Sequence, residues 1–202
     1  MSRLEPAGTT TSARAAALLD AGALVCFPTD TVYAVAGVAD IAATRDRLYA
    51  AKRRQMGQPM ALLAASADAL MPWVTVDDRA RELMGEFWPG ALTLVLVATP
   101  RAVAELGQVV RDGTLGVRVP DHPDAISILR SVAHPVAASS ANIHGAPAPI
   151  TGAEALANME DSVELVVDGR CEIGMGSSIL DLTLPEPRLL REGSIPAQRL
   201  LR

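Results

Sequence analysis

The chain has 202 residues, of which 50% are hydrophobic and 20% are charged, and its formal net charge is −5. This composition is that of a compact globular protein and excludes a disordered chain, and the acidic balance argues against broad affinity for nucleic acids. The N-terminus has no signal-peptide segment, the apolar runs are too short to cross a bilayer, and Cys26 and Cys171 lie far apart. We therefore expect a cytoplasmic protein with buried, reduced thiols.

Short apolar segments alternate with segments of helical periodicity along the whole chain. In chain order, the pattern predicts a helix that Thr11 or Ser12 caps and that ends near Asp20, a strand over 23–27, a helix over 40–51 capped by Asp40, a strand over 60–64 and a helix over 77–87. It then predicts strands over 91–98 and 115–119, a helix over 123–131, a strand over 136–138, a helix over 151–159 with a capping box, strands over 162–167, 178–182 and 188–191, and a last helix from Pro196. We expect one α/β domain over residues 1–202, with a core of about 12–195 and a mixed sheet flanked by helices.

Lys52 is the only lysine of the chain, beside 17 arginines, and it follows the helix predicted over 40–51. An ammonium is a compact point charge that suits contact with one phosphate or carboxylate oxygen, although a single lysine also arises by chance in an arginine-rich composition. Five cations and one anion lie between Arg45 and Arg54. In an acidic protein, this cluster predicts a small cationic pocket for a small anionic ligand rather than for a polyanion.

Polar side chains follow several of the predicted strands. These clusters are Pro28–Thr31, Lys52–Arg54, Thr114 with Arg118, Ser139–Asn142, Ser177–Ser178 and Arg191. Since ligands of open α/β sheets bind outside strand ends, the loops could form one pocket, although each cluster alone is explained more simply as a cap or a turn. The set offers cations and hydroxyl donors but no zinc spacing, Ser-His-Asp order, paired catalytic carboxylates or glycine-rich phosphate loop.

Six segments, in the same order, resemble the motifs of the YrdC-like family, the threonylcarbamoyl-AMP synthases. Residues 24–33 are similar to its FPTETVYGL signature, 51–60 to its K-x-R…N-P-L segment, and 87–94 to FWPGPLTL. Residues 117–123 are similar to VRMPDHP, 138–147 to APSANxSGxP, and 174–191 to GxxSTVVDLT…LR. The resemblance implies a single YrdC-like domain with a twisted mixed sheet and a concave ligand groove.

The family forms threonylcarbamoyl-AMP and pyrophosphate from L-threonine, bicarbonate and ATP, for the modification of adenosine 37 in certain tRNAs. The resemblance implies that Lys52 and Arg54 are the catalytic residues, which neutralise the triphosphate. It implies further ATP contacts from Gln58, Thr114, Ser140, Asn142 and Arg191, with Asn142 either touching the ligand or shaping its loop. It implies a threonine site made of Thr31, Arg118, Ala138 and Ser177, in which Arg118 holds the carboxylate.

The resemblance also implies cofactors and partners. Mg²⁺ is expected on the phosphates, held mostly by them and by water, with no metal site in the protein itself. The expected partners are the small-molecule substrates and a tRNA threonylcarbamoyltransferase that receives the product. Neither stable nucleic-acid binding nor a membrane is expected.

The chain departs from the family motifs at several positions. Leu63 stands where a histidine is common, and Gln58, Ala148, Ala34 and Ser178 replace the usual Asn or Lys, Ser, Gly and Thr. Leu63 and Ala148 leave open a diverged protein that forms a carbamoyl-adenylate, or one that binds a nucleotide or RNA without threonine activity. The acidic charge and a total of six aromatic residues weigh against RNA binding.

Overall fold

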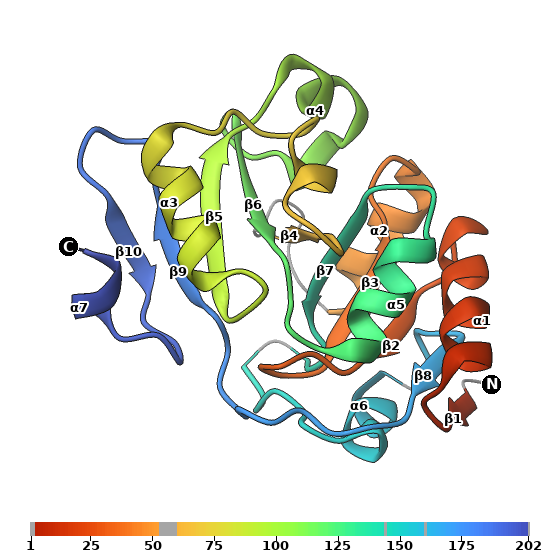
Figure 1. Ribbon diagram of the computed structural model, residues 1–202. Coiled ribbons are helices and arrows are strands. Elements are labelled where there is room, and N and C mark those ends of the chain that lie inside the picture. The colour runs from red at the N-terminus through yellow and green to blue at the C-terminus, as the bar shows by residue number, and fades with distance from the viewer. Residues whose placement is uncertain (1–2, 53–59, 144, 160, 202) are drawn as a thin grey trace.

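One mixed β-sheet of ten strands runs through the computed structural model, which describes residues 3–52, 60–143, 145–159 and 161–201 (Figure 1). In chain order, the strands are β1 (Arg3–Glu5), β2 (Val25–Phe27), β3 (Ala34–Val38), β4 (Ala61–Leu63), β5 (Leu92–Val97), β6 (Thr114–Arg118), β7 (Val136–Ser140), β8 (Leu165–Val167), β9 (Ser178–Asp181) and β10 (Arg188–Arg191). Across the sheet their order is β1-β8-β2-β3-β7-β4-β6-β5-β9-β10, with both parallel and antiparallel pairs. The expected α/β domain with a mixed sheet is confirmed.

Helices and short 3₁₀ turns connect the strands. In the described part of the chain, they are α1 (Thr9–Asp20), α2 (Ala42–Ala51), η1 (Asp68–Leu70), α3 (Asp78–Phe87), α4 (Pro100–Glu105), η2 (Gly107–Val109), α5 (Pro123–Ser131), α6 (Gly152–Met159) and α7 (Ala197–Leu200). Every predicted helix and strand has a counterpart, whereas β1, β3 and α4 were not predicted. None of the described helices is both long enough and apolar enough to cross a membrane.

The two faces of the sheet pack against different helices, because successive side chains of a strand point to opposite faces. On one face, Leu62, Val117 and Ala137 belong to a large core cluster that also takes in side chains of α2, α3, α4 and α6. On the other face, Leu63 and Ala138 pack with β2, β3 and β8 under α1 and α5. The sheet is therefore buried on one face and only partly covered on the other.

Two helices begin at positions other than those predicted. The first helix starts at Thr9, where Gly8 is the N-cap and no side chain caps the helix, so Thr11 and Ser12 lie inside it. The second starts at Ala42, with Ile41 as its N-cap. Asp40 does not cap this helix, because its carboxylate accepts a hydrogen bond from the ring of His134.

Side chains cap two other helices, of which the capping box at the start of α6 was predicted. The Asp77 Oδ1 atom accepts a hydrogen bond from the Ala80 amide at 2.7 Å at the start of α3. Thr151 and Glu154 form a reciprocal capping box, in which each side chain accepts from the other residue's amide. The two cysteines are buried and free, as expected, and burial raises the pKa of both thiols.

The contact between Asp40 and His134 joins the ends of two neighbouring strands. Asp40 follows β3 and His134 precedes β7, and the Nδ1 atom of the imidazole lies 2.7 Å from Asp40 Oδ2. The hydrogen bond to Asp40 is the main cause that raises the pKa of His134 above its ordinary value of 6.5. A histidine whose pKa is higher in the folded state binds its proton more tightly after folding.

We predict that this pair makes the free energy of unfolding depend on pH. Its contribution is complete below the pKa of the unfolded histidine and is lost as the pH rises through the higher folded value. Urea unfolding measured from about pH 5 to about pH 9 should show this loss of stability as the pH rises. In the His134→Gln variant, the free energy of unfolding should depend less on pH. A variant with the pH profile of the unchanged protein would contradict the prediction.

Candidate active site

A pocket of about 880 Å³ lies over the central strands, on the part of the sheet that α1 and α5 leave uncovered. Small residues on neighbouring strands line its floor, since Ala61 of β4 is the register partner of both Gly116 of β6 and Ala138 of β7. Larger side chains at these positions would fill the space above the sheet. The volume is in the range of sites that bind small molecules and cofactors.

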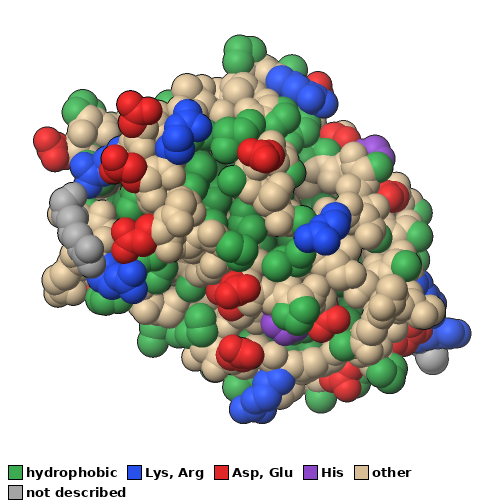
Figure 2. Space-filling model, in the orientation of Figure 1, with side chains coloured by type: hydrophobic (Ala, Val, Ile, Leu, Met, Phe, Trp, Pro, Cys, Tyr) green, Lys and Arg blue, Asp and Glu red, His purple; other side chains and the backbone are tan. Residues whose placement is uncertain are grey.

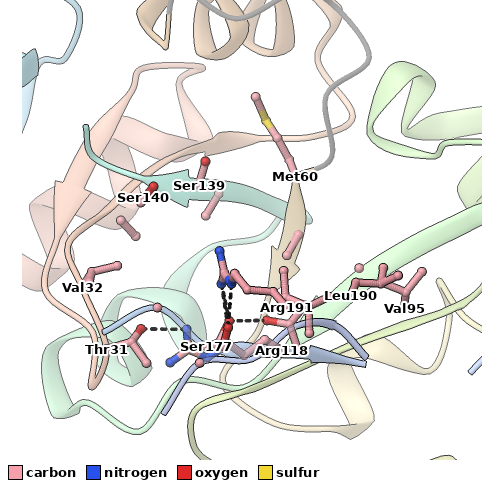
Figure 3. Close-up of a pocket in the computed structure, with 18 of the residues that line it drawn as sticks. Thr31, Val32, Met60, Val95, Arg118, Ser139, Ser140, Ser177, Leu190 and Arg191 are labelled. Carbon is pink, nitrogen blue, oxygen red and sulfur yellow. Dashed lines mark hydrogen bonds between the residues drawn. The ribbon is translucent and has the colours of Figure 1, made fainter. Parts of the chain in front are cut away.

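Most of the residues predicted for the site meet at this pocket (Figure 3). Those that line it are Thr31, Thr114, Arg118, Ala138, Ser140, Asn142, Ser177 and Arg191. Arg54 and Gln58 lie outside the described residues. The structure therefore brings together polar groups that are separated by as many as 160 residues in the sequence (from Thr31 to Arg191).

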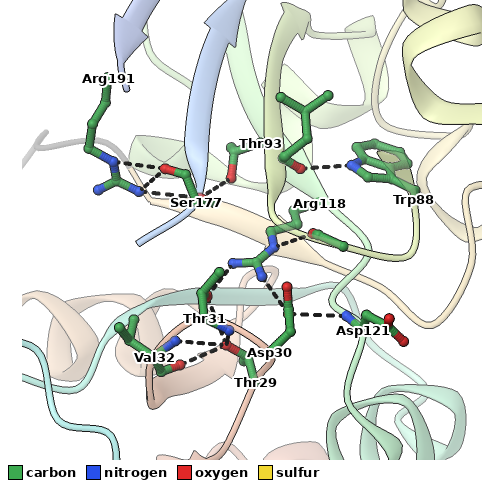
Figure 4. A network of polar contacts seen from close by, with 12 residues as sticks. Thr29, Asp30, Thr31, Val32, Trp88, Thr93, Arg118, Asp121, Ser177 and Arg191 are labelled. Carbon is green, nitrogen blue, oxygen red and sulfur yellow. Dashed lines mark hydrogen bonds and ion pairs between the residues drawn. The ribbon is translucent and has the colours of Figure 1, made fainter. Parts of the chain in front are cut away.

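Arg118 of β6 is a buried cation in the pocket wall (Figure 4). Its Nη2 donates to Asp30 Oδ1 at 2.5 Å, and its Nη1 donates to Thr31 Oγ1 at 2.9 Å. Its Nε donates to the Gly90 carbonyl at 2.9 Å. Burial lowers the pKa of Arg118 and the carboxylate of Asp30 opposes this shift, so the guanidinium stays charged at neutral pH. A fixed, buried guanidinium of this kind is suited to a carboxylate or phosphate.

Ser177 and Arg191 form a second polar group in the pocket wall (Figure 3). The Ser177 carbonyl accepts hydrogen bonds from Nε of Arg191 at 2.9 Å and from its Nη2 at 2.7 Å. The Ser177 hydroxyl lies 2.8 Å from the hydroxyl of Thr93 on β5. A Cβ atom at Gly176 would lie 3.1 Å from Nη2, so the guanidinium packs closely against this backbone.

Lys52 lies at the C-cap of α2, as predicted, but behind the pocket wall rather than in it. Its side chain is fully buried, and its ammonium donates to the Ser140 carbonyl and to Asn142 Oδ1, the latter at 2.9 Å. The Nδ2 group of Asn142 donates to the Ala146 carbonyl at 2.5 Å. Asn142 thus shapes the loop that separates Lys52 from the pocket, which is one of its two predicted roles.

Arg45 and Arg47, which precede Lys52 in the sequence, do not lie at the pocket. Arg45 donates to the Ala39 carbonyl at 2.6 Å, and Arg47 forms an ion pair with Glu164 at 2.5 Å. Both side chains thus tie α2 to neighbouring segments, and neither lines the pocket. The prediction of a cationic pocket built from residues 45–54 is wrong for Arg45 and Arg47, and Arg53 and Arg54 lie outside the described residues.

Charges of both signs line the outer part of the pocket. They include Arg111, Arg188, Asp112, Asp181 and Glu192, and the Arg188 guanidinium lies 3.2 Å from Asp181 Oδ2. Figure 2 shows hydrophobic side chains in the middle of one face of the molecule, with basic and acidic side chains dispersed around them. On the described part of this face, no continuous basic surface suited to a polyanion is present.

Sequence reasoning did not single out two residues that fix the pocket wall. Asp30 holds Arg118, and Thr93 is in contact with Ser177. Asp30 lies inside the polar cluster Pro28–Thr31, and Thr93 is the polar interruption in the apolar run 91–98. These sequence positions were the only signals that could have pointed to Asp30 and Thr93 as site residues.

Leu63 and Ala148, where the chain departs from the family motifs, both line the pocket. Leu63 is the register partner of Arg118 on the neighbouring strand, and its side chain also belongs to the core cluster under α5. The side chain next to Arg118 on the neighbouring strand is therefore apolar.

Comparison with known proteins shows which family the chain belongs to. The family model Sua5_yciO_yrdC, described as "Telomere recombination", matches residues 17–193. The chain belongs to this family. A "Putative threonylcarbamoyl-AMP synthase" of Mycobacterium tuberculosis (strain ATCC 25618 / H37Rv) is 41% identical over 184 residues, which are 90% of this chain and 83% of that protein. The resemblance expected from the motifs is confirmed.

A longer relative and two solved structures are also similar to the chain. The "Threonylcarbamoyl-AMP synthase" of Bacillus subtilis (strain 168) is 34% identical over 93% of this chain, which spans 55% of that protein's length. The crystal structure of Pyrococcus abyssi Sua5 complexed with L-threonine superposes with a TM-score of 0.89 at 31% identity, over 99% of this chain and 59% of that one. Escherichia coli YciO shares the fold over the whole of both chains, with a TM-score of 0.89 at 24% identity.

We predict that Gly116→Val blocks the pocket without unfolding the protein. A Cβ atom there would lie 3.5 Å from its nearest neighbour, the Met60 carbonyl oxygen, which is an ordinary contact, and valine suits a β-strand. The additional methyl groups would occupy the pocket floor, so calorimetric titration with ATP should show a loss of binding of about tenfold or more, with thermal unfolding little changed.

Gly85→Ala is the matched control, because a Cβ built at this α3 position would have no atom of the described residues within 4 Å apart from its own stretch of helix. Alanine should stabilise the helix slightly and leave ATP binding unchanged. Unchanged ATP binding by a folded Gly116→Val protein would show that the nucleotide does not bind over this part of the sheet.

Proposed function

We propose that the chain is a threonylcarbamoyl-AMP synthase, a nucleotidyltransferase that converts L-threonine, bicarbonate and ATP into threonylcarbamoyl-AMP and pyrophosphate. The observation that carries the proposal is the pocket wall in which Thr31, Arg118 and Ser177 meet. It is supported by the family relationship and by relatives that are named threonylcarbamoyl-AMP synthase.

The amino-acid end of the reaction is assigned to the surroundings of Arg118. Each terminal nitrogen of its guanidinium uses one N–H group in the contacts described with Asp30 and Thr31, and each carries a second N–H group. Two parallel N–H groups of a guanidinium match the two oxygens of a carboxylate. We propose that they hold the threonine carboxylate, with Ser177 and the backbone of Ala138 beside it.

The nucleotide end is assigned to Thr114, Ser140, Asn142 and Arg191, with Arg54 and Gln58 at the phosphates and with Lys52 adding its positive charge from behind the Ser140–Asn142 loop. The threonine amine and bicarbonate form a carbamate with the loss of one water molecule, and one carbamate oxygen attacks the α-phosphorus while the bond to pyrophosphate breaks. Such a displacement depends on positioning and on neutralising charge rather than on a protein nucleophile. The cations and hydroxyl groups of the site suit this chemistry.

We propose that magnesium enters with the nucleotide, as MgATP. Among the described residues, no group of three or more His, Cys, Asp or Glu side chains could hold a metal ion. Phosphate oxygens and water are sufficient ligands for Mg²⁺, which keeps several waters in most protein sites.

We also propose the bounds of the domain core, the protein that receives the product and the cellular location. The core of the domain would span about residues 12–195, and the match over residues 17–193 supports these bounds. The product would pass to a tRNA threonylcarbamoyltransferase, and a cytoplasmic location fits a role in tRNA modification.

The decisive measurement is pyrophosphate release from MgATP by the purified protein. We expect release only when both L-threonine and bicarbonate are present. Release with carbamoyl phosphate in their place would instead favour the formation of a carbamoyl-adenylate. The absence of release with every combination would overturn the proposal in favour of a binding protein.

We predict that Lys52→Met lowers turnover about a hundredfold or more, because it removes the positive charge and the hydrogen bonds that Lys52 supplies to the Ser140–Asn142 loop of the proposed nucleotide site. Methionine approximately preserves the length of the buried side chain, so thermal unfolding would report whether the fold is kept. Lys52→Arg serves as the comparison that retains the charge but changes its shape. Normal turnover by Lys52→Met would show that the ammonium has no phosphate role.

A further inference from the structure

Asp30 is a buried carboxylate to which the proposed reaction gives no role. It lies in the loop between β2 and β3, and only 6% of the residue is exposed. Its Oδ1 atom accepts from Arg118 Nη2 at 2.5 Å and from the Asp121 backbone amide at 3.1 Å. Its Oδ2 atom is buried without a hydrogen-bond partner among the described residues.

The contacts of Asp30 join three segments of the pocket wall (Figure 4). Arg118 belongs to β6, and Asp121 precedes α5, which covers the neighbouring part of the sheet. The backbone carbonyl of Asp30 accepts from the Ile173 amide at 3.0 Å, in the segment that leads to Ser177. One residue therefore ties the loop that carries Thr31 to the segments that carry Arg118 and Ser177.

Three hydrogen bonds fix the orientation of the Arg118 guanidinium. Gly90, Thr31 and Asp30 each accept from a different nitrogen, and only Asp30 supplies a negative charge. A long side chain that is ordered before its ligand arrives loses less conformational entropy on binding. The carboxylate also compensates a charge that would otherwise be buried alone.

We propose that Asp30 is a positioning residue for the amino-acid substrate, which acts by holding the guanidinium of Arg118 with its second pair of N–H groups directed to the substrate carboxylate. This inference rests on the proposed function. Asp30 does not line the pocket and its Oδ2 atom is inaccessible to solvent, so it acts through Arg118 and not by touching the substrate.

The test compares Asp30→Asn and Asp30→Glu with the unchanged protein in the pyrophosphate assay. Asparagine keeps an acceptor for Arg118 but loses the charge, and we expect the KM for L-threonine to rise about tenfold or more. The KM for ATP should stay within about twofold, because the proposed nucleotide site is made of other residues. Glutamate, which the family signature has at this position, should restore a lower KM for L-threonine than asparagine does.

Asp40→Asn is the matched control. Asp40 also pairs with a basic side chain through one oxygen and leaves the other oxygen buried and without a partner among the described residues, but it does not line or support the pocket. This variant should keep both KM values. Thermal unfolding of all variants separates a loss of fold from a loss of substrate binding.

The outcomes are distinct. No threonine-dependent release by the unchanged protein would overturn the proposed function itself. If the unchanged protein is active, an unaltered KM for L-threonine in Asp30→Asn would overturn the positioning role. Equal rises in the KM for L-threonine and for ATP would also overturn it, because they would indicate a general structural role.

Discussion

Cations buried in the pocket wall need partners, and the loops that supply these partners set the shape of the pocket. Arg118 is held by Gly90, Thr31 and Asp30, and the ammonium of Lys52 is held by the loop that contains Ser140 and Asn142. An unpaired charge in such surroundings would be strongly destabilising. The polar loops are thus fixed by the charges that they surround, and the site is largely ordered before a ligand binds.

The pocket itself follows from an unequal covering of the sheet. The helices α1 and α5 cover the β2, β3 and β8 side of one face, and the floor next to them carries the small residues Ala61, Gly116 and Ala138. Hydrophobic burial on the opposite face and under the two helices supplies the stability of the domain. The central strands can therefore carry small side chains where a core would require large ones.

Elements with a strong apolar period were predictable from the sequence, and elements built from small residues were not. Helix α3 was predicted because its apolar face repeats at helical spacing. Strand β3, Ala34–Val38, was not predicted because alanine and glycine give a weak strand signal. Its packing nevertheless requires a small residue at Gly37, where a Cβ atom would lie 2.7 Å from the side chains of Leu24 and Thr44. The polar clusters indicated the pocket, but local sequence does not reveal which partners a cation finds across the fold, as Arg45, Arg47 and Asp30 illustrate.

The last strand, β10, lies at one edge of the sheet and carries Arg191 into the pocket. It pairs only with β9 in the order of the described strands, and the Arg191 side chain contacts the Ser177 carbonyl and packs against Gly176. The floor strands β4, β6 and β7 pair with one another in the middle of the sheet, without β10. The pocket therefore combines a floor made by central strands with a wall that depends on an edge strand, so fraying of that edge would open the wall beside Ser177 while the floor stayed in place.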